Sequence, residues 1–155
     1  MNAMNSEALV KGKIAEATVE LLLEANGYNV RRISREGILG AISRADILNL
    51  NQSDSAGKIT TAPSLAVFDK KGKNVILTKI KFRGSIAKGR NISHGVKQLL
   101  AYWPEAVLVV VTLDSPTFRV ILTSGEERPI EDLFSQITKN SLEEFERIVE
   151  KFLKV

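Results

Sequence analysis

The sequence predicts a mixed α/β (α+β) fold, in which one β-sheet of mixed strand direction is flanked by helices. Three observations predict it. Helical patterns open and close the chain, two strand-like runs joined by a short turn span residues 64–83, and a continuously apolar run follows at 106–111. Helices and strands in this order stack as layers around a core. A chain of 155 residues is expected to form a single domain over residues 1–155.

The first helix is expected from about Ser6 to Asn26, with Ser6 as its N-cap and Gly27 ending it. Helical spacing predicts an apolar stripe of Ile14, Ala17, Thr18, Leu21, Leu22 and Ala25. Val19 and Leu23 lie on the other side, so the helix is expected to be well buried. A short strand is expected over 28–33, and the Gly-rich, polar stretch 34–62 is expected to be a long irregular connection.

A β-hairpin is expected next, with strands over 64–69 and 74–83 and a turn in which Gly72 takes a positive φ. In its second strand Thr78, Ile80 and Phe82 alternate with Lys79, Lys81 and Arg83, which predicts one apolar and one cationic face.

The rest of the chain is expected to form a loop over 84–92, a helix over 93–103 and strands over 106–113 and 117–123. The last helix is expected to be capped by Ser141, with an apolar stripe of Leu142, Phe145, Ile148, Val149, Phe152 and Leu153.

The charge distribution predicts a polyanionic partner. Residues 70–104 contain no acid, although they contain the bases Lys70, Lys71, Lys73, Lys79, Lys81, Arg83, Lys88, Arg90 and Lys97. Such segregated basic charge is typical of nucleic-acid-binding proteins.

The absence of cysteine excludes disulfides and cysteine-based metal sites, and a reducing, cytoplasmic setting is expected. No apolar run approaches the ~18 residues needed to span a membrane, so no membrane partner is expected.

Four patches carry a family resemblance. They are the helix segment ending in Glu16, the pair Pro63-Ser64, the triplet Lys79-Ile80-Lys81, and Gln98 with Tyr102 four residues later. In this order they resemble the PD-(D/E)xK nuclease superfamily, the restriction-endonuclease-like fold that includes Holliday-junction resolvases. The predicted order of elements is also the core topology of that fold. The resemblance implies that Glu16, Ser64, Lys79, Lys81, Gln98 and Tyr102 converge as a vestigial catalytic site.

The chain departs from the family at the positions that hold the metal. Ser64 stands where the family has its first Asp, Lys79 stands where it has the second acid, and Lys81 alone is kept. The family's chemistry needs Mg²⁺ held by oxygen ligands. Lys79 would place a positive charge there, and two unit charges ~4 Å apart repel by roughly 4 kcal/mol at an effective dielectric constant near 20. We therefore expect no bound cofactor and no metal-dependent catalysis.

Three functions remain open from the sequence. The first is a non-catalytic nuclease-fold protein that binds nucleic acid through Lys79, Lys81 and Arg83, with Lys88 and Arg90 in the next loop. The second is an active, Mg²⁺-dependent endonuclease in which Glu16 and Asp46 hold the metal, whereas Asp69 is expected to point at the turn. The third is a scaffold subunit whose surfaces bind protein. A homodimer is a further expectation, because small members of this fold often pair.

Overall fold

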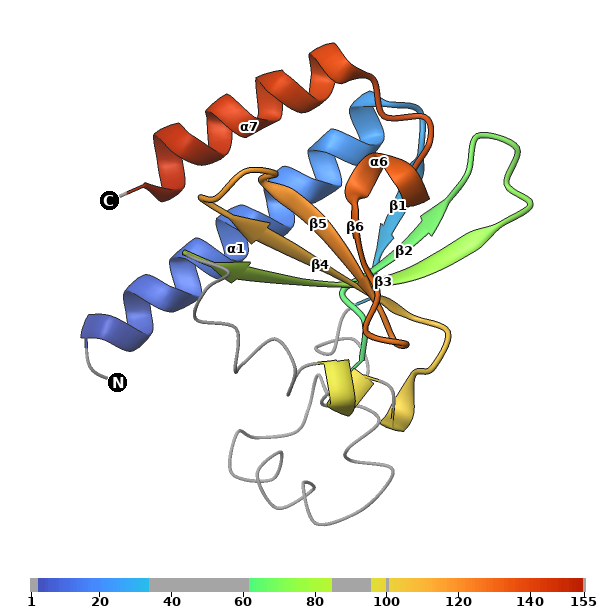
Figure 1. The fold of residues 1–155 in the computed structure, drawn as a ribbon, viewed down its shortest axis with the longest axis horizontal. Helices are drawn as coiled ribbons and strands as arrows, with labels where there is room; N and C mark the ends of the chain where they lie inside the picture. The colour runs from blue at the N-terminus through green and yellow to red at the C-terminus, as the bar shows by residue number, and fades with distance from the viewer. Residues whose placement is uncertain (1–2, 34–61, 85–95, 100, 155) are drawn as a thin grey trace.

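A computed structural model describes residues 3–33, 62–84, 96–99 and 101–154 of the chain (Figure 1). The predicted mixed α/β class is confirmed, since one six-stranded sheet is flanked by helices. Along the chain the elements are α1 (Ala3–Ala25), β1 (Asn29–Arg32), β2 (Leu65–Phe68), β3 (Val75–Arg83), β4 (Val107–Thr112), β5 (Phe118–Leu122), β6 (Glu127–Pro129), α6 (Ile130–Leu133) and α7 (Lys139–Leu153).

The strands lie in the sheet in the same order as in the chain, from β1 to β6. β3 and β4 run parallel, and the other neighbouring pairs run antiparallel. β6 and α6 were not predicted, because three and four residues are too few to produce a recognisable periodicity.

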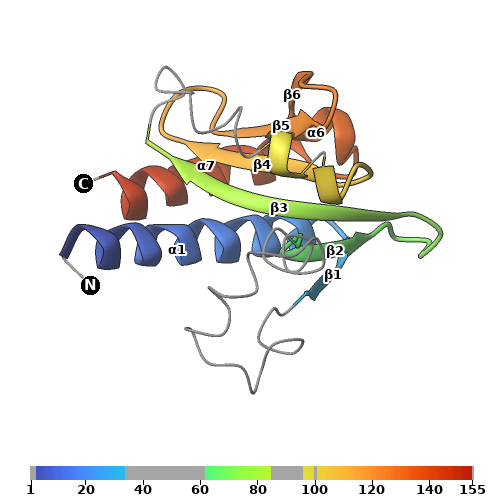
Figure 2. The same cartoon turned by 90° about the horizontal axis from the view of Figure 1, so that it is seen from below.

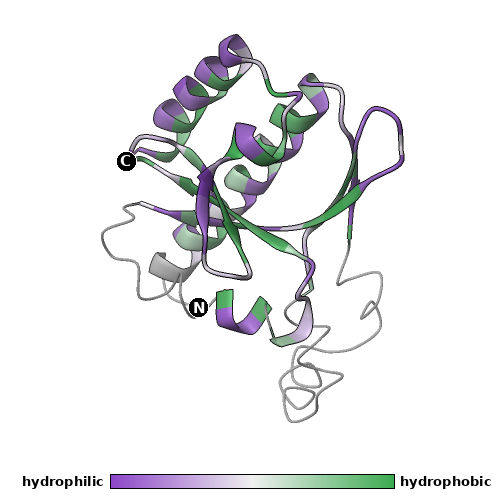
Figure 3. Cartoon of the chain, turned by 45° about the vertical axis from the view of Figure 1, so that its right-hand side comes forward, coloured by the Kyte–Doolittle hydropathy of each residue, from purple (hydrophilic) through white to green (hydrophobic). Residues whose placement is uncertain are grey.

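The sheet is covered on both faces, which places the core in two layers. On one face α1 and α7 lie side by side and antiparallel, so that the two chain termini lie at the same end (Figures 1 and 2). On the other face Leu99, from a helical stretch at 96–99 and 101–102, packs on Leu108 and Val110 of β4. All six residues of β4 are buried, as predicted for a central strand. Figure 3 shows the hydrophobic strands inside and the hydrophilic hairpin turn outside.

The buried face of α1 differs from the predicted stripe. Its fully or nearly fully buried residues are Ala15, Thr18, Val19, Leu22 and Leu23. Leu21, which was predicted in the stripe, is 55% exposed. The helix is apolar on several sides, so helical spacing alone did not fix the side that packs on the sheet. Its end is as predicted, because Gly27 adopts a φ of 87° that favours glycine.

A hydrogen-bonded junction fixes the end of α1 to the start of α7. The Asn26 side-chain amide donates to the Leu22 carbonyl (2.7 Å) and to Ser141 Oγ (2.8 Å), and its Oδ1 accepts from the Thr138 N–H (3.0 Å). The predicted cap of the last helix is wrong, because α7 begins after Thr138, whose side chain accepts from the Ser141 N–H. Ser141 therefore lies in the first turn and joins two helices.

The hairpin turn agrees with its prediction. Gly72 adopts a φ of 68°, and the Asp69 carboxylate accepts from the Lys73 N–H (3.0 Å) and the Asn74 side-chain amide (2.9 Å). The hydrogen bond from Asn74 lowers the pKa of Asp69, since it stabilises the charged form. Asp69 therefore holds the turn and does not enter a metal site.

Candidate nucleic-acid interface

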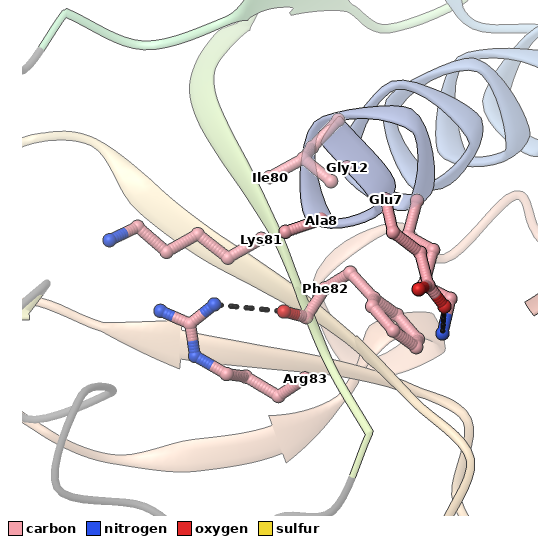
Figure 4. A pocket seen from close by; sticks show the side chains of 8 residues that line it. Glu7, Ala8, Gly12, Ile80, Lys81, Phe82 and Arg83 are labelled. Carbon is pink, nitrogen blue, oxygen red and sulfur yellow. Dashed lines mark hydrogen bonds and ion pairs between the residues drawn. The ribbon is translucent and has the colours of Figure 1, made fainter. Parts of the chain in front are cut away.

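Because side-chain direction alternates along β3, its apolar and basic side chains lie on opposite faces of the sheet. Ile76, Ile80 and Phe82 pack in the core cluster that contains residues of α1. Leu77 packs on the other face, and Lys79, Lys81 and Arg83 share its side of the strand because side chains alternate with period two. Figure 4 shows the Lys81 and Arg83 side chains extending away from α1. We refer to Lys79, Lys81 and Arg83 as the cationic face.

The Ser64 backbone lies next to β3, the strand that carries the cationic face. Ser64 directly precedes β2, whose first residue, Leu65, pairs with Thr78 of β3. The Ser64 N–H donates to the Thr78 carbonyl at 2.8 Å. The structure therefore places the Ser64 backbone beside the residue that precedes Lys79.

Two cations of this face, Lys81 and Arg83, lie close together and lack an acidic partner in the described part of the chain. Burial, and then the charge of Arg83, lower the pKa of the Lys81 ammonium group. The Arg83 Nη1 donates to the Phe82 carbonyl at 2.8 Å, whereas its buried Nε has no hydrogen-bond partner among the described residues (Figure 4). An anion placed here would relieve the repulsion and accept hydrogen bonds.

A pocket of about 490 Å³ lies between β3 and the first turns of α1. Residues 80–83 line one side, and Glu7, Ala8, Lys11 and Gly12 line the other. The charged ends of Lys81 and Arg83 extend away from this side of the strand, and the Lys11 ammonium pairs with the Glu7 carboxylate at 3.1 Å (Figure 4). The pocket is therefore not the place where the charge of the cationic face gathers.

Glu16 does not belong to the cationic face. It lies on α1, which covers the opposite face of the sheet, and its carboxylate is 3.8 Å from the Lys13 ammonium group. Its charge also acts on Arg32 of β1, whose pKa is raised chiefly by its hydrogen bond to Glu20. The predicted convergence of Glu16 with Lys79 and Lys81 is thus corrected, because β3 directs Ile80 and Phe82, not its lysines, toward α1.

Gln98 and Tyr102 come from the helical stretch on the same face of the sheet as the lysines. Leu99 is directed at the sheet, Gln98 is exposed and Tyr102 is partly buried. Their i, i+4 spacing places them on one side of that stretch. Asp46, Lys88 and Arg90 lie outside the described residues. Within the described ranges, no three His, Cys, Asp or Glu side chains gather closely enough to hold a metal ion.

A second pocket, of about 430 Å³, is lined by three acidic side chains and by the basic Arg147 and Lys154. It lies between the β4–β5 turn and α7, with Ser115 and Thr117 on one side and Glu143, Glu146 and Glu150 on the other. Burial, and then the charges of Glu131 and Glu143, raise the pKa of Glu146. The sequence showed the cluster of acids but no signal for the pocket, which depends on a turn meeting a helix about 30 residues later.

Glu146→Gln is expected to raise the free energy of unfolding at pH 7. A carboxyl group whose pKa is higher in the folded state binds its proton more tightly there than in the unfolded state. The stability gained from this tighter proton binding is lost as the pH rises through the folded-state pKa, and at pH 7 the charged carboxylate is left in an unfavourable site. The gain should be a few tenths of a kcal/mol, because solvent screens a partly exposed carboxyl group. It should vanish near pH 4, where the unfolded-state carboxyl is also largely protonated. Urea unfolding at both pH values measures it, and Glu105→Gln, at an exposed site, is the control.

Comparison of the chain with protein-family models, with curated proteins and with solved structures gave no match. None of the helices in the described ranges combines the length and apolarity that crossing a membrane requires.

Proposed function

We propose that this chain is a nuclease-fold protein of the PD-(D/E)xK type that has lost metal-dependent catalysis and binds nucleic acid through the cationic face. One observation carries the proposal. Three cations project from one side of β3, and neither Lys81 nor Arg83 has a carboxylate partner among the described residues. The phosphate backbone of a nucleic acid is the partner that supplies a regular row of anions to such a strand.

The loss of catalysis is supported by the residue types at positions 64 and 79, where the resemblance places the metal-binding acids. Ser64 directly precedes β2, and its N–H donates to the carbonyl of Thr78, the residue before Lys79 on β3. A hydroxyl group and an ammonium group at these positions give a divalent cation one neutral oxygen and one repelling charge. The same pair favours an anion, because the lysine supplies charge and the serine can donate a hydrogen bond.

Binding of a fluorescently labelled duplex, and of a single strand of equal length, tests the proposal. With three to five phosphate contacts, the logarithm of the affinity for duplex DNA should fall against the logarithm of salt with a slope of roughly −3 to −4.5. Lys79→Ala with Lys81→Ala should reduce this slope by about two without changing sequence preference. Lys139→Ala with Lys154→Ala, two exposed lysines at the ends of α7 across the sheet, is the matched control and should leave the slope unchanged.

Two results would contradict the proposal. Absence of binding at low salt, or binding insensitive to the Lys79 and Lys81 changes, would favour the scaffold subunit. Cleavage of DNA by the wild-type chain with Mg²⁺ or Mn²⁺, abolished by EDTA, would establish the active nuclease instead.

A further inference from the structure

The β2–β3 hairpin carries an apolar pair on the face of the sheet opposite α1. Leu65 and Val67 of β2 pack in the core cluster that contains residues of α1, so Phe68 points to the other face. Phe68 is partly exposed and belongs to neither core cluster, and the register pairs it with Val75 of β3, which is 52% exposed. Figures 1 and 2 show this hairpin extending past the rest of the sheet. We refer to Phe68 and Val75 as the apolar pair.

Cations lie on both sides of the apolar pair along the hairpin. Val75 lies on the side of β3 that carries the cationic face, because side chains alternate with period two. Val75 and Lys79 are four residues apart, which is about 13 Å along a strand. Beyond the other end of the pair, the turn carries three exposed lysines that have no acidic partner in the described part of the chain, namely Lys70, Lys71 and Lys73.

Hydrogen bonds fix the turn that carries these lysines. The Lys70 N–H donates to Gln136 Oε1 at 3.2 Å, and the Gln136 side-chain amide donates to the Asn26 carbonyl at 2.9 Å. Asp69, the acid of the turn, accepts hydrogen bonds from within the turn. The turn lysines therefore extend from backbone that is tied to the rest of the fold, and the nearby acid is already engaged.

Arg31 of β1 adds a cation that the sequence did not indicate. Val30 packs in the core cluster that contains residues of α1, and Arg32 pairs with Glu20 of that helix at 2.7 Å. Arg31 lies between them and therefore points to the opposite face. The register pairs Arg31 with the residue two before Phe68, so the two are diagonal neighbours about 7–8 Å apart. Arg31 is exposed and has no acidic partner among the described residues.

The described acids do not neutralise the charge around the apolar pair. β1, β2 and β3 contain no acid. The acids of α1 belong to the helix that covers the opposite face of the sheet. Glu127 of β6 pairs with Arg119 at 2.8 Å, and Glu105 lies in the turn before β4. The strands that hold the apolar pair therefore present cations, and no acid, to a ligand.

We infer that the hairpin binds single-stranded nucleic acid, with an unpaired base stacked on Phe68 beside Val75 and phosphates on the flanking cations. Binding of single strands combines a positively charged track for the backbone with aromatic side chains on which bases stack. In a duplex each base is already stacked between its neighbours, so a duplex would engage the cations but not Phe68. This inference rests on the proposed function and names the form of nucleic acid that the site takes.

Two labelled oligonucleotides of equal length test the inference, one of oligothymidylate and one an abasic sugar-phosphate chain. Both carry the same phosphates, but only the first carries bases. Fluorescence anisotropy should show that the wild type binds oligothymidylate at least about fivefold more tightly, since stacking one base on an aromatic side chain contributes about that factor. A duplex of the same length serves as the third ligand.

Substitutions at Phe68 separate its ring from its apolar bulk. Phe68→Leu should abolish the preference for oligothymidylate and leave binding of the abasic chain and of the duplex unchanged, because leucine remains apolar opposite Val75 but has no ring to stack on. Phe68→Trp should retain the preference. Phe152→Leu is the matched control, the same change at a phenylalanine 55% exposed on α7, and should alter none of the three affinities. Circular dichroism checks that each variant is folded.

The outcomes distinguish this inference from the proposed function. Equal affinity of the wild type for oligothymidylate and the abasic chain overturns the inference, although the cationic face still binds phosphates. A Phe68→Leu variant that keeps the preference, or that weakens all three affinities alike, overturns it too. Failure of the wild type to bind any of the three ligands at low salt overturns the proposed function as well.

Discussion

Replacing Leu22 by alanine is expected to lower the free energy of unfolding by about 2–5 kcal/mol. Leu22 is completely buried in α1 and belongs to the core cluster between the helix layer and the sheet. Truncation removes buried methyl groups and leaves a cavity that the packed surroundings fill only in part. The loss is large against the ~5–15 kcal/mol by which domains are usually stable. Urea unfolding followed by circular dichroism measures it.

Leu9→Ala is the matched control, because it makes the same change in the same helix at a side chain that is 54% exposed. Its effect should stay within about 0.5 kcal/mol, since an exposed leucine leaves no cavity. Equal effects of the two substitutions would contradict the observed orientation of α1 on the sheet.

Creating a metal site is the second large effect expected. Ser64→Asp with Lys79→Glu should place two carboxylates on neighbouring segments, because the Ser64 N–H donates to the carbonyl of Thr78, the residue before Lys79. The change adds two oxygen ligands for a hard divalent cation. It also removes a repulsion of roughly 4 kcal/mol, which alone is about a thousandfold in affinity. Calorimetric titration with Mn²⁺ should therefore detect binding to this variant and none to the wild type.

Ser64→Asn with Lys79→Gln is the control for this experiment. It has side chains of nearly the same shape but no negative charge, so it should not bind Mn²⁺. A folded Asp–Glu variant that also fails to bind Mn²⁺ would show that the two positions cannot form a metal site, and would remove one support of the proposed nuclease ancestry.

Local patterns in the sequence are sufficient to predict much of the fold. Gly27 and Gly72 are predicted at the end of a helix and in a turn, and both adopt the positive φ that glycine permits. The alternation of Lys79, Ile80, Lys81 and Phe82 predicts the composition of the two faces of β3. These properties depend on residues that are neighbours in the chain, and backbone geometry with its period of two or 3.6 residues suffices to predict them.

Which faces of α1 and β3 pack against each other depends on contacts between distant parts of the chain. Sequence patterns show that β3 has a cationic side and that α1 is apolar nearly all round. They do not show that α1 packs on the apolar side of β3, which separates Glu16 from Lys81 and leaves Leu21 exposed. Thr138, not Ser141, caps α7 for a similar reason, since Asn26, more than 100 residues earlier, engages Ser141. The packing of distant elements depends on the total area they bury and the polar groups they satisfy together, which no local pattern records.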